Sequence, residues 1–250
     1  AVCFTFLPQL TRETQTAQKV KDTPILVITG NPPYSYASKN NGEWITSKIK
    51  DYYKVDNEAL KERNPKGLQD DYVKFIRFAQ DKMDKTEQGI VGIITNHSFL
   101  DNPTFRVMRQ SLLNTFDQLY FIDLHGNSLK KETTPEGNKD ENVFDIKQGV
   151  CISIFIKRKG LEKGIFHKDF YGLRKEKFLS CLESSINTID FTAIKPNSPF
   201  YLFIPQNQEN REKYEKFWSL KDIFELNSVG IVSSNDDLFI SFKEKEIRDR

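Results

Sequence analysis

Glycine and cysteine are scarce in this chain. Its 250 residues include 12 glycines and 3 cysteines, which are Cys3, Cys151 and Cys181. The cysteines are odd in number and have no Cys-x-x-Cys spacing, so a disulfide framework and a cysteine-based zinc site are both unsupported, and a reducing, cytoplasmic setting is expected. The composition also excludes collagen-like and disordered classes.

The sequence also lacks long apolar runs and an excess of one charge. Its longest apolar stretches, 25–28 and 150–156, are far shorter than the roughly 18 residues of a membrane helix, so we expect a soluble protein without a membrane partner. The 37 basic and 35 acidic residues give a net charge of +2, which argues against a purely electrostatic nucleic-acid binder. Aromatic residues are plentiful, with 20 phenylalanines, and indicate a packed interior.

Strand-like and helix-like segments alternate over the first two thirds of the chain. Four short apolar runs are predicted strands: 24–29, 89–95, 118–124 and 150–157. Two segments with apolar residues at helical spacing, 70–83 and 103–116, separate the first three of them. This order is typical of an open α/β sheet with parallel crossovers, in which ligands bind where the strands end. We expect the run 24–29 to be a buried, parallel strand.

The pattern weakens after residue 159, and we place a domain boundary there. Residues 1–159 form the predicted main α/β unit, and residues 160–250 a smaller, mixed α+β segment. Within that segment the strand-like runs are 165–171, 200–204 and 238–242, and a polar helical stretch covers 209–218. The polar stretch 130–142 is predicted to be a mobile surface loop.

The tetrapeptide Asn31-Pro32-Pro33-Tyr34 directly follows the first predicted strand. The Asn31 side chain and the Pro32 carbonyl are two acceptors for the two hydrogens of one amino group, and the consecutive prolines hold them rigid. Tyr34 adds a flat ring that can stack on a heterocycle. Accepting both N–H bonds out of plane frees the nitrogen lone pair, so an exocyclic amine becomes nucleophilic without a strong base. The alternative is a proline-rich turn that only ends a strand.

This tetrapeptide resembles the catalytic motif of amino-group methyltransferases that use S-adenosylmethionine, in the Asn form typical of adenine-N6 DNA methyltransferases. Further segments follow in the order of that family's later motifs: 71–75, 89–96, 105–116 and 143–157. The resemblance implies the C-terminal part of a Rossmann-like fold, catalytic roles for Asn31, Pro32, Pro33 and Tyr34, and an adenine flipped out of double-stranded DNA.

The same resemblance assigns three further residues. Phe144 would be the second aromatic side chain at the flipped base, and Asp71 and Phe75 would lie near the adenine of the cofactor. For the two phenylalanines the alternative is an ordinary place in the core or on the apolar face of a helix.

The closer resemblance is to the methylase part of the type IIG and type ISP restriction-modification enzymes. It is carried by residues 52–56, 64–72 and 224–231 and is strongest over 24–158. It implies further domains of the same polypeptide, and residues 160–250 would begin a linker or target-recognition region. Because the chain contains no Gly-x-Gly turn and little sequence precedes Pro24, we expect a fragment without the main cofactor-binding motif.

Other chemistries find little support. His97, His125 and His167 stand singly, without an HxxxH spacing or a nearby cysteine pair, so we expect no metal site. Two functional alternatives stay open: the amino or amide group could belong to an RNA guanine or a protein glutamine, or the chain could be a non-catalytic DNA-recognition or scaffold module.

If the main cofactor motif lies outside these residues, the chain alone will bind S-adenosylmethionine weakly or not at all and will be inactive. Isothermal titration measures this directly. Micromolar binding by the 250-residue chain would contradict the expectation.

Overall fold

The computed structural model describes residues 8–34, 38–55, 58–60, 65–207, 209–224, 226, 241 and 243–248. They divide into two units, 1–205 and 206–250. Most of the predicted strand 238–242 and of the segment 224–231 lies outside the described residues, as do Asp56 and Asn64.

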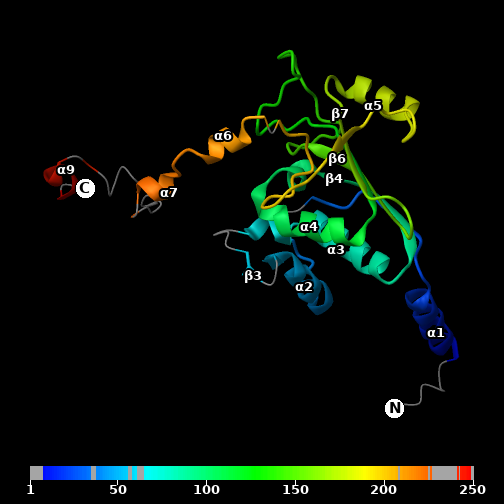
Figure 1. Ribbon diagram of the computed structural model, residues 1–250. Helices are drawn as coiled ribbons and strands as arrows, with labels where there is room; N and C mark the ends of the chain where they lie inside the picture. Colours follow the sequence, from blue (N-terminus) through cyan, green and yellow to red (C-terminus); the bar gives the residue numbers. More distant parts are fainter. Residues whose placement is uncertain are drawn as a thin grey trace. The chain divides into compact units, whose positions relative to one another are not determined.

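A six-stranded mixed sheet organises the first unit (Figure 1), in the order β1-β4-β6-β5-β7-β8. Its strands are β1 (Val27–Gly30), β4 (Gln88–Asn96), β5 (Gln118–Asp123), β6 (Val150–Arg158), β7 (Gly164–Asp169) and β8 (Thr192–Ile194). The pairs β1–β4 and β5–β7 are parallel, whereas β6 is antiparallel to both β4 and β5. Therefore β1, β4, β5 and β7 all run in one direction, and their carboxyl ends lie at the same edge of the sheet.

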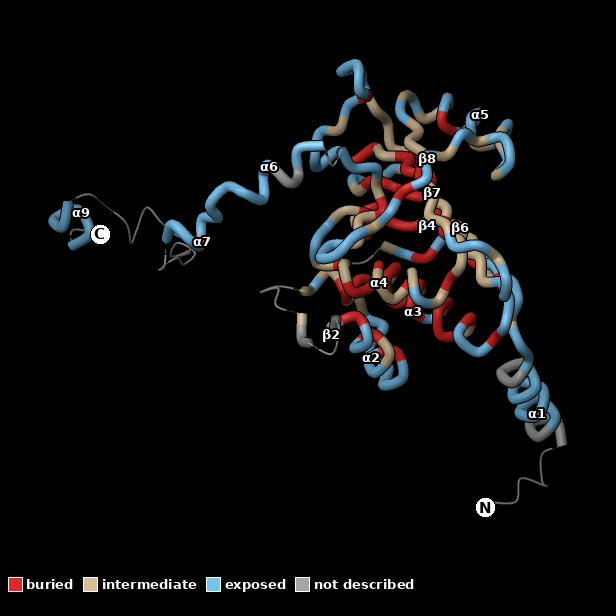
Figure 2. The backbone as a smooth tube through the Cα atoms, viewed as in Figure 1, coloured by how far each residue is buried: buried red, intermediate tan, exposed pale blue. Residues whose placement is uncertain are grey.

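Helices cover both faces of this sheet. On one face α3 (Asp71–Asp84) and α4 (Arg106–Thr115) pack on β4, β5 and β6. Figure 2 shows buried residues, in red, along these helices and strands. On the other face α5 (Arg174–Glu183) and the segment 189–191 pack against a smaller cluster. The Asp70 side chain accepts from the backbone N–H of Tyr72 and so caps α3 where the sequence predicts the helix to begin.

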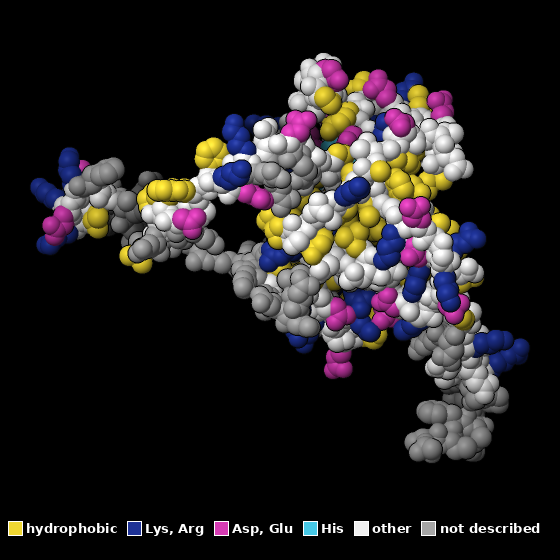
Figure 3. Space-filling model, viewed as in Figure 1, with side chains coloured by type: hydrophobic (Ala, Val, Ile, Leu, Met, Phe, Trp, Pro, Cys, Tyr) yellow, Lys and Arg dark blue, Asp and Glu magenta, His cyan; other side chains and the backbone are white. Residues whose placement is uncertain are grey.

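The remaining elements are short, apart from the first helix. They are α1 (Pro8–Asp22), α2 (Glu43–Ile49), β2 (Lys54–Val55), β3 (Glu58–Ala59), α6 (Arg211–Glu215), α7 (Leu220–Ile223), α9 (Glu244–Arg248) and the 3-10 helices η1 (Lys50–Tyr53), η2 (Pro65–Gln69), η3 (His97–Leu100) and η4 (Pro103–Phe105). No helix among the described residues has the length and apolarity to cross a bilayer. On the face shown in Figure 3, basic and acidic side chains are interspersed.

The predicted strands and helices of residues 70–158 are confirmed, and the mixed sheet makes the fold α/β. The first strand is parallel as predicted, but its predicted burial is wrong: Val27 is 63% exposed. Its apolar side chains gain little cover because β1 pairs only with β4 among the described strands and lies at the sheet edge.

The predicted boundary after residue 159 does not coincide with the division of the structure at 205/206. Residues 164–169 and 192–194 extend the same sheet as β7 and β8. The run 200–204 is not a strand. It is held instead by the buried Arg109, whose guanidinium donates to the carbonyl oxygen of Phe200 at 2.6 and 3.0 Å.

A buried ion pair ties helix α5 to the chain between β5 and β6. The Lys177 ammonium lies 2.8 Å from a carboxylate oxygen of Asp140, and both side chains are fully buried. It also donates to the carbonyl oxygens of Leu124 and Glu141, each at 2.7 Å. Each of its three donors therefore has an acceptor, which a buried ammonium requires.

Replacing Lys177 by Ala should destabilise the protein by roughly 3–5 kcal/mol. The buried Asp140 carboxylate would lose its cationic partner and keep only the backbone N–H groups of Gly126 and Gly172, and two carbonyl groups would lose a donor. Urea unfolding of the purified chain measures the loss. The exposed neighbour Lys175 is the matched control, since Lys175→Ala removes the same charge from the same helix. Equal unfolding midpoints for the two variants would contradict this account of Lys177.

Candidate functional site

Polar side chains gather where the four co-directional strands end. Asn31 follows β1, His97 follows β4, and Asp123 and Asp169 are the last residues of β5 and β7. Strand β6 begins at this same edge, since Val150 pairs with Asn96. The chain between β5 and β6 therefore starts and finishes at the edge that carries the tetrapeptide, and open α/β sheets bind their ligands at such an edge.

The tetrapeptide is exposed at two of its residues and anchored by the other two. Asn31 and Pro33 are exposed, Pro32 is buried and Tyr34 is half-buried. The Tyr34 hydroxyl donates to the Asn31 side-chain oxygen at 3.3 Å, and its ring meets the buried Tyr72 of α3 edge-to-face, with 6.4 Å between centroids. Burial, with a smaller contribution from Cys151, raises the pKa of Tyr34 far above its usual value, so the side chain is a neutral phenol.

Tyr34 and Phe144, far apart in the sequence, meet at one apolar cluster. We call it the edge cluster, and it consists of Ile122, Leu124, Val143 and Val150. Both rings are half-buried and pack against it. The two aromatic residues that the resemblance assigned to a flipped base thus pack against the same cluster, and each is only partly buried.

The two residues assigned to the cofactor lie on α3. The side chain of Asp71 accepts from the Ser38 hydroxyl at 2.5 Å, which ties the chain after the tetrapeptide to this helix. Phe75 is 42% exposed and lines a pocket of about 310 Å³, together with the exposed Trp44 and Phe78. Phe75 is therefore not a core residue, and its pocket has aromatic walls that suit a flat ring.

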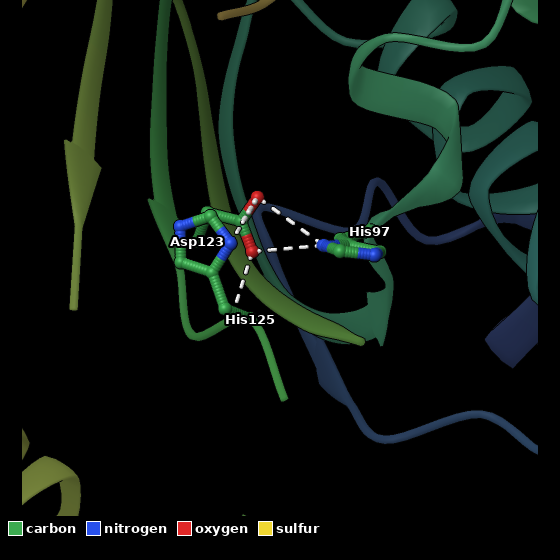
Figure 4. A group of neighbouring side chains, drawn as sticks. All are labelled: His97, Asp123 and His125. Carbon is green, nitrogen blue, oxygen red and sulfur yellow. Dashed lines mark hydrogen bonds and ion pairs between the residues drawn. The ribbon is translucent and has the colours of Figure 1, made fainter. Parts of the chain in front are cut away.

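A cluster of His97, Asp123 and His125 lies at the same edge (Figure 4) and was missed by the sequence analysis. His97 Nδ1 lies 3.0 and 3.2 Å from the two carboxylate oxygens of Asp123. The backbone N–H of His125 donates to Asp123 at 2.9 Å, and the His125 ring Nε2 donates to Asp169 at 2.8 Å. The signal in the sequence was positional, because these residues follow or end two neighbouring predicted strands.

Among the described residues, this cluster is the group that could offer three ligand atoms to one metal ion. Its hydrogen bonds already assign a proton to His97. The Asn127 side-chain oxygen accepts from the backbone N–H groups of Leu129 and Lys130, so the amide nitrogen faces His97 Nε2 at 3.3 Å. An amide nitrogen only donates, which makes Nε2 the acceptor and places the ring proton on Nδ1, toward Asp123. A metal ion there would have to displace that proton, and the prediction of no metal site stays a prediction.

Hydrogen bonds and neighbouring charges shift the pKa values of the carboxylates and of His125 at this edge. Burial alone would raise the pKa values of Asp123 and Asp169, but hydrogen bonds from the neighbouring histidines and the charge of His125 lower both below their usual range. Burial alone would lower the pKa of His125, but its hydrogen bond to Asp169 and the nearby carboxylates raise it. The His125 ring also stacks on the Tyr171 ring with 4.0 Å between centroids, so the protonated imidazole of His125 has an aromatic face beside it.

The His125→Gln substitution should lower the melting temperature more at pH 6 than at pH 9. A raised pKa in the folded state means that protonated His125 stabilises the fold at pH values below about 6.5, and that this contribution is lost as the pH rises through the folded-state pKa. Thermal unfolding of both proteins across this range tests it. A difference that is constant, or that widens toward pH 9, would show that His125 is not held as a cation.

About half of this chain, including most of the residues described above, matches a known protein family. Residues 12–129, which include the tetrapeptide, α3 and the His97–Asp123–His125 cluster, match the family described as Eco57I restriction-modification methylase. The predicted resemblance to restriction-modification methylases is thereby confirmed. No curated protein sequence matches the chain.

Three solved structures resemble nearly the whole chain. A DrdV–DNA complex is 27% identical, with a TM-score of 0.70, over 94% of this chain and 25% of its own. A nuclease-deletion mutant of the type ISP restriction-modification enzyme LlaGI, in complex with a DNA substrate mimic, is 26% identical, with a TM-score of 0.73, over 96% of this chain and 24% of its own. The ATP-dependent type ISP enzyme LlaBIII bound to DNA is 27% identical, with a TM-score of 0.69, over 95% of this chain and 16% of its own. The chain thus spans a quarter or less of each relative.

Proposed function

We propose that this chain, which matches the Eco57I restriction-modification methylase family over residues 12–129, is the catalytic part of an adenine-specific DNA methyltransferase. It transfers a methyl group from S-adenosylmethionine to the N6 amino group of an adenine in double-stranded DNA, within a larger restriction-modification enzyme. The observation that carries the proposal is the position of Asn31-Pro32-Pro33-Tyr34 at the carboxyl end of β1, with Tyr34 and Phe144 at one cluster.

The tetrapeptide performs the chemistry by accepting hydrogen bonds. The Asn31 side-chain oxygen and the Pro32 carbonyl oxygen would accept the two N–H bonds of the adenine amino group, so that its nitrogen lone pair is free to form the new bond to the methyl carbon. The bond from that carbon to the sulfonium sulfur would break, the sulfur would keep the electron pair as a thioether, and the nitrogen would release one proton to solvent. Asn31 is exposed, and its oxygen keeps a second lone pair besides the one that the Tyr34 hydroxyl uses. As a neutral phenol, Tyr34 offers the base a ring to stack on and takes no part as a base.

The target adenine must leave the duplex to reach these groups. A flipped base loses its neighbours in the stack, and aromatic side chains replace them. Tyr34 and Phe144 meet this need from two different segments that the edge cluster holds together. The three relatives are described as DNA complexes, which favours double-stranded DNA over an RNA guanine or a protein glutamine as the acceptor.

The cofactor supplies the methyl group, as a sulfonium. The aromatic pocket of Trp44, Phe75 and Phe78 fits the adenine ring of such a cofactor by size and chemistry. Asp71 lies one turn before Phe75 on α3, and its bond to Ser38 leaves the second carboxylate oxygen for a cofactor hydroxyl. The rest of the cofactor site, target recognition and DNA cleavage or translocation belong in this proposal to other parts of the polypeptide.

Replacing Asn31 by Ala should lower the methylation rate about 100-fold or more, because one of the two preorganised acceptors is lost. DNA binding should stay within about twofold, since a single hydrogen bond to one base adds little to contacts with the DNA backbone. The two readouts are methyl transfer to DNA and fluorescence anisotropy of a labelled duplex, in an active polypeptide that contains these residues.

The exposed Asn187 provides the control, and Asn187→Ala should match the wild type in both assays. Methylation that survives Asn31→Ala would refute the catalytic role. Loss of DNA binding with unchanged turnover of bound DNA would favour a recognition module.

A further inference from the structure

The segment 124–149 connects β5 to β6 and carries Phe144. It has no regular strand or helix, apart from a single bridge between Thr133 and Lys139. An irregular segment of this length needs other contacts to keep one conformation. In this structure those contacts converge on residues 140–145.

Arg174, near the start of α5, binds the backbone on both sides of Phe144. Its Nε donates to the carbonyl oxygen of Asn142 at 2.7 Å, and its Nη2 donates to the carbonyl oxygen of Phe144 at 3.0 Å. The same Nη2 lies 2.8 Å from a carboxylate oxygen of Asp145. A planar guanidinium has its donors in a fixed fork, so these bonds fix the direction of the backbone through residues 142–144.

The Asn142 side chain completes the arrangement from within the segment. Its amide nitrogen donates to the carbonyl oxygens of Gly126 at 3.0 Å and Gln148 at 2.6 Å, which joins the beginning of the segment to its end. Its oxygen accepts from the backbone N–H of Phe144 at 2.9 Å. The N–H and the carbonyl group of Phe144 therefore both have a side-chain partner. Gly126 allows this approach, since a Cβ there would lie 2.4 Å from the Cα of Asn142.

The side chain of Arg174 is less buried than that of Lys177, which lies one turn further along α5. Lys177 and its partner Asp140 are fully buried, whereas the side chains of Arg174 and Asp145 are 38% and 93% exposed. Loss of a buried charge partner destabilises a fold, but loss of a partly exposed one costs little stability. Lys177 therefore holds the segment to the sheet, and Arg174 acts on its local conformation.

We propose that Arg174 is a positioning residue for the target base: it fixes the backbone of Phe144 so that the ring is held at the edge cluster, against which Tyr34 also packs, before the base arrives. The inference rests on the proposed function and adds a residue from outside the span 24–158 to the catalytic edge. A ring held in advance does not have to be ordered when the base binds, and this increases affinity for the flipped state.

The test is a double-mutant cycle in an active polypeptide that contains these residues. Arg174→Ala and Phe144→Ala should each reduce kcat/KM for DNA methylation roughly 10- to 100-fold, since small displacements of a positioned group have effects of this size. The double variant should be no worse than Phe144→Ala alone, because Arg174 acts through Phe144. Losses that multiply in the double variant would overturn the proposal. Lys175→Ala should equal the wild type, and an Arg174→Ala variant that also equals it would overturn the proposal too.

Two further measurements separate positioning from folding and from the proposed function. Hydrogen exchange of the backbone amides of residues 142–146 should accelerate in Arg174→Ala and not in Lys175→Ala, at an unchanged melting temperature; unchanged exchange would contradict the proposal. With 2-aminopurine at the target position, Arg174→Ala should change the fluorescence of the bound duplex in the same direction as Phe144→Ala, and a wild-type signal would contradict the proposal.

The Asn31→Ala variant separates this proposal from the proposed function. If Asn31→Ala keeps its activity, the proposed function fails. If Asn31→Ala is inactive and the losses of Arg174→Ala and Phe144→Ala multiply in the double variant, only the positioning role is refuted.

Discussion

The shared direction of β1, β4, β5 and β7 is the constraint on which the rest of the site depends. Because these strands run the same way, their carboxyl ends meet at one edge and bring Asn31, His97 and Asp123 together there. The antiparallel β6 between β4 and β5 has an equally important effect. It begins at that edge, so the segment from β5 to β6 starts and ends there, and Phe144 packs against the same cluster as Tyr34. A parallel crossover in its place would have taken the chain to the opposite edge.

Buried charge at this edge is paired throughout the described residues that form it. Lys177 meets Asp140 and two carbonyl oxygens, and the carboxylates of Asp123 and Asp169 each meet histidines. Burying such groups without partners would cost several kcal/mol each, so the pairs are required once the groups are inside. They bind the irregular segment between β5 and β6 to regular elements. The edge that carries the tetrapeptide is therefore held by paired side chains, although much of its chain is neither helix nor strand.

The fold of residues 70–158 could be predicted because apolar spacing there follows a single period in each element. The exposure of β1 could not, because an apolar run shows what a strand is able to bury and not whether a neighbour covers it. The sequence predicts the strand-like run that forms β7, but it does not predict that residues 160–205 belong to the first unit, because β8 has only three residues, too few for a pattern. Their place in the sheet follows from pairing across long sequence distances. The run 200–204 predicts a strand, but the carbonyl group of Phe200 binds the Arg109 guanidinium and that of Phe203 binds the His167 ring, instead of backbone groups of a neighbouring strand.

The site was predictable to the extent that its chemistry is local. Asn31 to Tyr34 form one continuous motif, and the structure confirms where the motif lies, at the end of β1. The histidines are far apart in the sequence and come together only because two strands end side by side. Arg174 gives no signal in the sequence because two of its acceptors are backbone carbonyl groups.

We propose that this edge delivers a methyl group to an adenine amino nitrogen. The most direct test of this proposal is mass spectrometry of the nucleosides from DNA incubated with isotopically labelled S-adenosylmethionine and an active polypeptide that contains these residues. The account predicts label in N6-methyladenine; label in a methylated cytosine, or in RNA or protein in place of DNA, would contradict it.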